Sequence, residues 1–281
     1  MIVSTPHCHT TFVDGRASAE EMVLAALEHG FVSIGFSEHA PEYRGSVSLA
    51  MEDYPRYIAE VRRLQKAYEG RIRVHLGIER DRVAYARRED FEYVLAANHY
   101  LTHGEGDPLY PSRADSAAAD GSLASILAWR DRYYGGNGEK LAKEFFLRSG
   151  RYALAQKPDI FAHFDLIKKQ NRGGEIYNPE DAGVRSAAFE ALDMIFASGA
   201  MLEVNTGGMA RSSQPRPYPD PVYLKYWHDL GGRVIVGSDC HRPHQIAYAF
   251  DTVGDYLREA GFRSVWRLGG FGEDRFTEDF L

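Results

Sequence analysis

Seven short apolar runs, nearly all separated by stretches of helical periodicity, constrain the fold of this chain more than any other feature of its sequence. Strands that alternate with helices pair in parallel through right-handed crossovers. The pattern therefore predicts an α/β fold, and a closed sheet of this kind would be a TIM-like barrel one strand–helix unit short of the usual eight. An open doubly wound sheet is the alternative. The runs lie at residues 2–5, 32–37, 71–78, 91–97, 159–162, 201–205 and 233–238.

The intervening segments predict helices and one long insertion. Helices are expected at about residues 18–30, 51–68, 122–134, 139–155 and 179–198, with another after the proline-rich stretch at 215–221. Residues 102–156 exceed an ordinary crossover, and we expect this inserted helical segment to cover part of the site as a lid. Residues 245–281 predict a helix and a short apolar tail. No domain boundary is evident, so residues 1–281 are expected to form a single domain.

Most of the apolar runs end on histidine, aspartate or glutamate. The first run leads into His7-Cys8-His9, and side chains two apart on an extended strand point to the same side, with Cys8 pointing away. Each such residue alone is as often an ordinary loop side chain, but nine of them near the ends of six strands are unlikely by chance. Loops at the C-terminal ends of a closed barrel face one centre, whereas the outer strands of an open sheet would lie too far apart, so the pattern favours the barrel. The nine are His7, His9, Asp14, His39, Glu79, His99, His163, Asp239 and His241.

These nine side chains point to metal chemistry. One tetrahedral ion needs about four ligands, so nine are too many for one ion and enough for two or three if a carboxylate bridges. Imidazole with carboxylate and no thiolate suits zinc, manganese or iron and is poor for magnesium or calcium. Cys8 and Cys240 are therefore expected to be small core residues.

Composition and charge limit the classes of partner that we expect for this protein. With 33 basic and 40 acidic residues, the formal net charge is 33 − 40 = −7, and no basic block suggests a nucleic-acid groove. No apolar run approaches the roughly 20 residues of a membrane span, and the N-terminal residues do not resemble a signal peptide. Two cysteines fit a reducing compartment. We expect a cytoplasmic protein that acts on a small molecule, without nucleic-acid or membrane partners; the oligomeric state stays open.

The strand-end motifs, in their order, resemble those of the PHP (polymerase and histidinol phosphatase) superfamily over about residues 1–255. Two further stretches, residues 165–169 and 202–208, are similar to its histidinol-phosphatase branch. The motifs are His7-Cys8-His9, Asp14-Gly15, Ser37-Glu38-His39, Gly77-Ile78-Glu79, Asn98-His99-Tyr100, Ala162-His163-Phe164-Asp165 and Gly237-Ser238-Asp239-Cys240-His241.

This resemblance implies a distorted seven-stranded β/α barrel with three metals. It implies that His7, His9, Glu79 and Asp239 hold one ion, that Glu79 bridges to a second held with His99 and His163, and that Asp14, His39 and His241 hold the third. It further implies hydrolysis of L-histidinol phosphate, in histidine biosynthesis, by a hydroxide that bridges two metals. The catalytic residues would then be His7, His9, Glu79, Asp239 and His241.

The substrate phosphate needs a partner besides the metals. The protein's net negative charge does not attract an anion, so a few local basic residues must supply that partner. Arg211, after the sixth run, is the first candidate, and Arg172 and Lys168, after the fifth, come second or form a solvated basic loop. His103 is expected to have no catalytic role. Three alternatives remain: a phosphoesterase of the same scaffold with another small substrate, an accessory module of a DNA polymerase, and a metal-binding protein without enzymatic activity.

Overall fold

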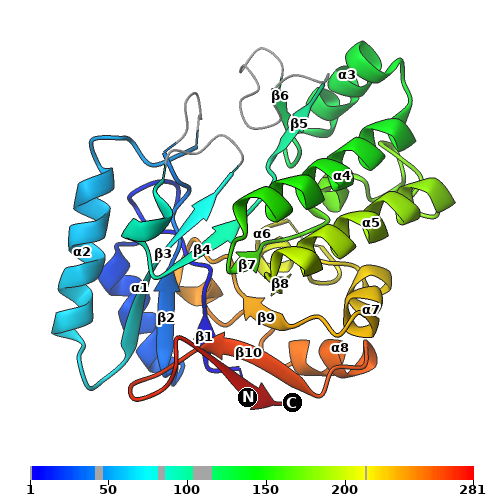
Figure 1. Cartoon of the computed structure of the whole chain (residues 1–281). Helices are drawn as coiled ribbons and strands as arrows, with labels where there is room; N and C mark the ends of the chain where they lie inside the picture. The colour runs from blue at the N-terminus through cyan, green and yellow to red at the C-terminus, as the bar shows by residue number, and fades with distance from the viewer. Residues whose placement is uncertain (1, 42–46, 82–85, 104–115, 213) are drawn as a thin grey trace.

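A computed structural model describes residues 2–41, 47–81, 86–103, 116–212 and 214–281, and it contains all seven predicted strands (Figure 1). Each strand lies within or close to the apolar run that predicted it. The α/β class is therefore confirmed. The seven strands are β1 (Ser4–Thr5), β2 (Ser33–Phe36), β3 (Arg73–Arg80), β4 (Tyr93–Ala96), β7 (Ile160–Phe161), β8 (Met201–Asn205) and β9 (Val234–Gly237).

These strands form one mostly parallel sheet. Among the described residues its order is β1-β2-β3-β4-β7-β8-β9-β10-β11, and every pair from β1 to β10 is parallel. The last two strands, β10 (Ser264–Leu268) and β11 (Phe276–Phe280), pair antiparallel where the sequence predicted an apolar tail. The expected helix in that region is the short α8 (Val253–Glu259). The burial of Val265 between the half-buried Ser264 and Trp266 is the local signal for a strand there.

The ladder of described strands does not close into the expected barrel. β1 stands at one end of the order and β11 at the other, because β10 pairs with β9 at Trp266 and Ile235 on the edge that closure would need. A single bridge between Cys8 and Cys240 connects the segments that follow β1 and β9. Both cysteines are free and buried, as expected for core residues. The sheet is thus open by its hydrogen bonds but curved enough for its first and seventh strands to meet.

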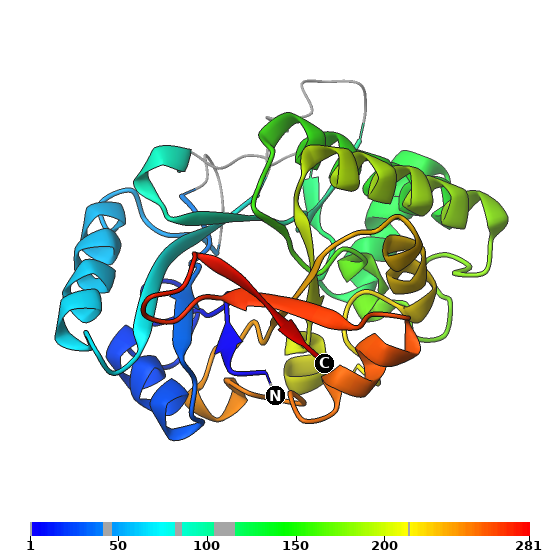
Figure 2. The ribbon, with the colours of Figure 1, turned by 60° about the horizontal axis from the view of Figure 1, so that its bottom comes forward.

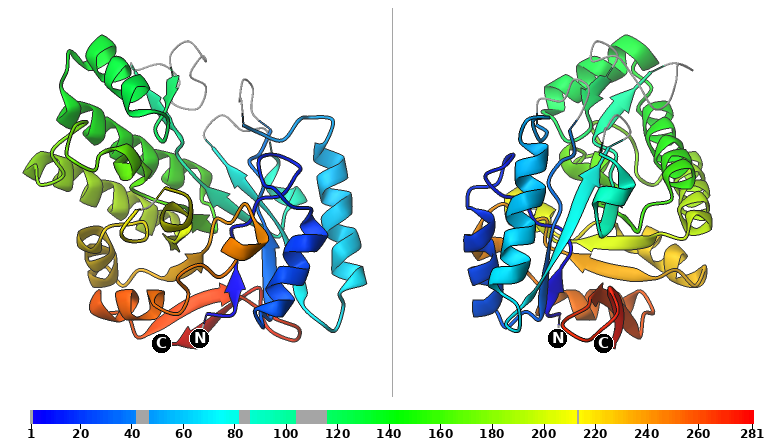
Figure 3. Two further views of the ribbon diagram at one scale, coloured as in Figure 1. Left: turned by 180° about the vertical axis from the view of Figure 1, so that it is seen from behind. Right: turned by 60° about the vertical axis from the view of Figure 1, so that its left-hand side comes forward.

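Helices surround this curved sheet (Figure 2). Helices α1 and α2 lie side by side on one flank (Figure 3), and α4 and α5 pack against each other on the other. Gly150 of α4 permits this packing, because a Cβ there would lie 2.8 Å from the Cα of Ala191. No helix in the described ranges has the length and apolar character needed to cross a lipid bilayer. The longer helices are α1 (Ala19–Glu28), α2 (Tyr54–Ala67), α3 (Leu123–Tyr134), α4 (Gly138–Gln156), α5 (Ala182–Ser198) and α7 (Pro221–Asp229), with the short α6 (Gly207–Ser212) before α7.

The inner face of the sheet is apolar at one level and polar above it. Tyr93 fills the apolar level: a Cβ at Gly35 or Gly77 would lie 2.2 Å from its ring or hydroxyl, so the two glycines leave room for it. Its hydroxyl donates to the carbonyl of Pro6 at 2.5 Å, although β4 and β1 are not neighbours in the ladder. The buried side chain of Tyr93 therefore supports the strand ends at which the polar side chains gather.

The long insertion divides into a hairpin and two helices. Strands β5 (Tyr100–Thr102) and β6 (Ser116–Ala118) pair antiparallel, and Ala119 N donates to the carbonyl of His99 at 2.7 Å. Helix α4 serves as the crossover from β4 to β7, with Tyr152 donating to the carbonyl of Arg80. Residues 104–115, within the predicted lid, lie outside the described residues.

Candidate metal centre and substrate cavity

The nine predicted side chains lie together at the C-terminal ends of the parallel strands. His7 and His9 follow β1, His39 follows β2, and Glu79 is at the end of β3. All nine belong to four overlapping groups within which the potential ligand atoms are no more than 4.8 Å apart. The groups are His7, His9 and Glu79; His7, His163 and Asp239; His39, Glu79 and His99; and His9, Asp14, His39 and His241.

The two histidines after β1 face two carboxylates at a spacing suited to one ion. Nε2 of His7 lies 3.5 Å from Glu79 Oε2 and 3.7 Å from Asp239 Oδ1. Nε2 of His9 lies 3.6 Å and 3.4 Å from the same two oxygens. Ligands about 2.0–2.1 Å from a tetrahedral centre are about 3.3–3.4 Å apart, so these four atoms could surround one ion with little movement.

Glu79 presents its two oxygens to different histidines. Oε1 lies 3.0 Å from His163 Nε2 and 3.6 Å from His99 Nε2, whereas Oε2 faces His7 and His9. His39 Nδ1 is also close to Oε2, at 2.9 Å. A carboxylate with its oxygens directed to opposite sides has the geometry of a bridging ligand.

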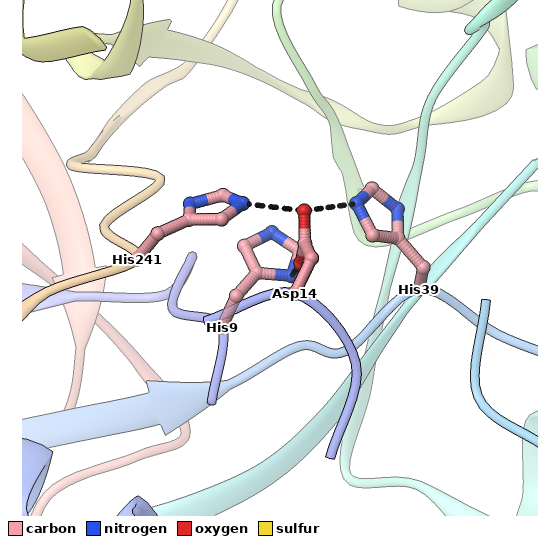
Figure 4. A group of neighbouring side chains, drawn as sticks. All are labelled: His9, Asp14, His39 and His241. Carbon is pink, nitrogen blue, oxygen red and sulfur yellow. Dashed lines mark hydrogen bonds and ion pairs between the residues drawn. The ribbon is translucent and has the colours of Figure 1, made fainter. Parts of the chain in front are cut away.

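Asp14 connects the remaining histidines (Figure 4). Its Oδ2 lies 3.0 Å from His241 Nε2 and 4.0 Å from His39 Nε2, and its Oδ1 lies 3.8 Å from His9 Nδ1. The turn that carries Asp14 is tight: a Cβ on Gly15 would lie 2.5 Å from the backbone of Thr10. His9 thus faces both the Asp14 group and the Glu79 group, which the family resemblance alone did not indicate.

Two features show that the donors fit a metal. Nε2 of both His7 and His9 is buried without a hydrogen-bond partner among the described residues, and buried polar atoms are rarely left so. His163 and Asp239 have φ angles of 24° and 46°, a region that non-glycine residues seldom adopt. Backbone strain of this kind clusters at functional sites, where the surrounding structure holds it in place.

Three carboxylates that the sequence analysis did not single out lie near the Nδ1 atoms of three of these histidines. Glu203 Oε1 lies 2.8 Å from His7 Nδ1, and Asp81 Oδ2 lies 2.8 Å from His99 Nδ1. Glu38 contacts His9 Nδ1 at 3.7 Å and accepts from Thr10 N at 2.7 Å. The two hydrogen-bonded carboxylates, Glu203 and Asp81, fix the tautomer and raise the basicity of their imidazoles, whereas Glu38 lies beyond hydrogen-bond distance of His9. The signal in the sequence was a glutamate within the apolar strand β8.

Electrostatics also favour cations here. Burial disfavours the charged form of His7, but the carboxylates of Glu203, Asp239 and Glu79 outweigh it and raise its pKa well above the usual range. Burial likewise opposes the charged form of His9, yet the nearby carboxylates of Asp239 and Glu38 raise its pKa to about 10. The pKa of Glu79 falls well below its ordinary value despite burial, because histidines surround it. A divalent cation would displace the protons that these imidazoles hold.

A cavity of about 190 Å³ opens beside the cluster. Arg211, on α6, lines it and contacts Asp239 Oδ2 at 2.5 Å and His241 Nε2 at 3.0 Å. Lys169 also lines it and donates to Asp120 Oδ2 at 2.7 Å. Besides the metal-type residues Asp14, His39, His99, His163, Asp239 and His241, its walls include Tyr100, Ala118, Leu166, Gly207 and Tyr218.

The other basic candidates lie outside this lining. Lys168 Nζ is held by Asp220 at 2.6 Å and Asp165 at 3.1 Å, and it packs over the ring of Tyr218. Arg172 donates to the carbonyl of Ser212. The ring of His103 packs at a tilt against that of Tyr133, with centroids 4.8 Å apart. The structure therefore brings Arg211 and Lys169 to the cavity rather than Lys168 or Arg172.

Residues 6–207 match the PHP domain family. A protein of Deinococcus radiodurans named "Probable histidinol-phosphatase" is 28% identical over 92% of this chain and 94% of its own length. The "Histidinol-phosphatase" of Bacillus subtilis is 25% identical, over 89% and 96%. The crystal structure of the Lactococcus lactis histidinol phosphate phosphatase, with zinc, L-histidinol and phosphate, aligns with a TM-score of 0.66 at 19% identity, over 94% of this chain and 95% of that one. With a match over well over half of its length, this chain belongs to the PHP domain family.

Proposed function

We propose that this protein is a metal-dependent phosphomonoesterase that hydrolyses L-histidinol phosphate to L-histidinol and phosphate, a reaction of histidine biosynthesis. The observation that carries the proposal is the convergence of six histidines and three carboxylates beside a cavity lined by Arg211 and Lys169. The names of nearly full-length relatives support the substrate.

The donor set suits two or three divalent ions, with zinc, manganese or iron as the candidates. His7, His9, Glu79 and Asp239 would hold one ion. Glu79, His99 and His163 would hold a second, and the group around Asp14 in Figure 4 would hold a third. Bound ions would supply the positive charge that acidifies water and offsets the charge of the phosphate.

The protein's own side chains would bind and orient the substrate. Arg211 offers a planar fork that can meet two phosphate oxygens, and Lys169 adds a second positive charge at the cavity wall. Glu203 and Asp81 would keep the imidazoles of His7 and His99 in the required tautomer. No side-chain nucleophile is needed in this scheme, since water attacks phosphorus.

The curved sheet is a β/α barrel so distorted that its hydrogen-bonded ladder does not close. The Cys8–Cys240 bridge at the seam, where the segments after β1 and β9 meet, supports this description. One large cluster of buried residues draws on most elements and supports a single domain. Two free buried cysteines are in keeping with a cytoplasmic enzyme whose partner is a small phosphorylated metabolite.

Phosphate release tests this function. Purified protein would be assayed with L-histidinol phosphate and a panel of sugar and nucleoside monophosphates, with metal content measured on the same sample. We expect the highest kcat/KM for L-histidinol phosphate, loss of activity on chelation, and recovery with zinc or manganese. A higher kcat/KM for a sugar or nucleotide phosphate would overturn the substrate, and full activity in the chelated, metal-free protein would overturn the metal dependence.

A further inference from the structure

The wall of the cavity beside His99 carries a carboxylate, Asp120. It lies in the turn between β6 and α3, and the hydrogen bond from Ala119 N to the carbonyl of His99 fixes that turn beside a metal-type histidine. Among the described residues that line the cavity, three are acidic, and Asp14 and Asp239 belong to the metal-type groups. Asp120 is therefore the cavity carboxylate that the proposed metal chemistry leaves without a role.

Asp120 contacts Lys169, which lines the cavity together with Arg211. Asp120 Oδ2 accepts from Lys169 Nζ at 2.7 Å, and both side chains are partly exposed, at 32% and 22%. A phosphate that enters the cavity would compete with Asp120 for the ammonium of Lys169. Once Lys169 turns to the phosphate, the carboxylate of Asp120 needs another positive partner, because an unpaired charge in a partly desolvated wall is costly.

We propose that Asp120 is a specificity-determining residue that binds a protonated amino group on the alcohol portion of the substrate. The substrate class is then the phosphate monoesters of amino alcohols, in which an ammonium lies a few bonds from the ester oxygen. This inference rests on the proposed phosphatase function and adds to it the basis of leaving-group selection. A neutral alcohol would leave Asp120 paired with Lys169 and keep that lysine from the phosphate.

The test compares a substrate that carries this charge with one that lacks it. Kinetics would be measured with L-histidinol phosphate and with its N-acetyl derivative, which retains the imidazole and the phosphate. For Asp120→Asn we expect kcat/KM for L-histidinol phosphate to fall ~10- to 100-fold, mainly through KM, the range of one charge-assisted hydrogen bond. For the N-acetyl derivative we expect no loss of kcat/KM, because the substitution releases Lys169 to the phosphate, with metal content unchanged.

Asp131→Asn is the matched control, since Asp131 lies on α3, pairs with Arg130 and does not line the cavity. It should leave both substrates unchanged. An equal loss for both substrates in Asp120→Asn, or no loss for either, would overturn the role of Asp120 while phosphatase activity of the wild type still stands. If the wild type prefers another amino-alcohol phosphate, the histidinol assignment fails and the role of Asp120 holds. If it releases phosphate from none, both fail.

Discussion

Replacing Glu203 by glutamine should weaken metal binding although Glu203 does not face the cavity. Its Oε1 contacts His7 Nδ1 at 2.8 Å, while Oε2 accepts from His163 N at 3.1 Å and from Asn205 Nδ2 at 2.8 Å. Glutamine has the same shape but offers one oxygen. If that oxygen meets the two fixed donors, its NH₂ group faces His7 and forces the proton onto Nε2, the atom directed to Glu79 and Asp239.

The size of this effect follows from the lost contact. Removing a carboxylate that orients a metal-binding histidine costs about 10- to 100-fold in metal affinity, or ~1.4–2.7 kcal/mol. The opposite amide orientation would place two donors face to face and destabilise the fold instead. Gly237 makes room for the native carboxylate, because a Cβ there would lie 1.9 Å from Oε1. Little relaxation is therefore available to the variant.

Competition with a calibrated chelator would measure metal affinity, with circular dichroism and thermal unfolding as checks of folding. Glu92→Gln is the matched control, since Glu92 contacts the buried His75 at 3.2 Å and does not contact the metal-type residues. We expect weaker binding in Glu203→Gln alone, with kcat/KM partly restored by excess metal. A folded Glu203→Gln protein with wild-type metal affinity would refute the orienting role.

Three further changes probe separate parts of the molecule. Glu79→Gln should lose at least one ion, because a neutral amide bridges two cations poorly; full metal content by elemental analysis, with full turnover, would contradict the bridging role. Arg211→Ala should keep its metal while kcat/KM falls ~10- to 1000-fold, and Arg211→Lys should recover part of the loss; lost metal would instead mean that Arg211, which contacts Asp239, supports the ligands. Burial raises the pKa of Glu92, but the contact with His75 and the hydrogen bonds from Gln65 and Arg62 outweigh it and lower this pKa to about 2. Because this pKa lies below its unfolded value, the pair stabilises the fold above about pH 4.5 and loses that effect as the pH falls towards 2. Allowing for partial exposure, urea unfolding should show Glu92→Gln to be ~1 kcal/mol less stable than wild type at pH 7 and nearly equal at pH 2.5; an equal difference at both pH values would contradict the pairing.

Local periodicity was sufficient for the seven predicted strands and for the polar residues at their ends, but not for β5, β6, β10 and β11. His7 and His9 converge because extended backbone repeats every two residues, and this holds whether or not the sheet closes. Closure of the sheet depended instead on which strands pair in the folded protein. β10 pairs with the edge of β9, and nothing local to residues 264–268 specifies that partner. The assumption that an open sheet separates its outer strands was wrong, since curvature brings β1 and β9 into contact through the Cys8–Cys240 bridge.

The supporting residues were harder to predict for different physical reasons. Glu203 lies inside a strand rather than at its end, so it does not belong to the pattern of polar residues that follow the strands. Lys168 and Lys169 are adjacent in a short 3₁₀ segment, Leu166–Gln170, and which of them faces the cavity depends on the rotation of that turn. Composition and spacing do not determine that rotation. Burial against Tyr218 and pairing with Asp220 hold Lys168 in the other direction.

The seam between β1 and β9 also bears on how the protein is synthesised. Asp14 and His241 meet across it although they are 227 residues apart. At about 5–20 residues per second, a ribosome needs roughly 10–45 s between these two positions. During that time a nascent chain has His7, His9 and Glu79 but neither Asp239 nor His241, so metal cannot complete the site during most of translation. The finished centre is thus available only to chains that have been translated through β9, and truncated products lack it.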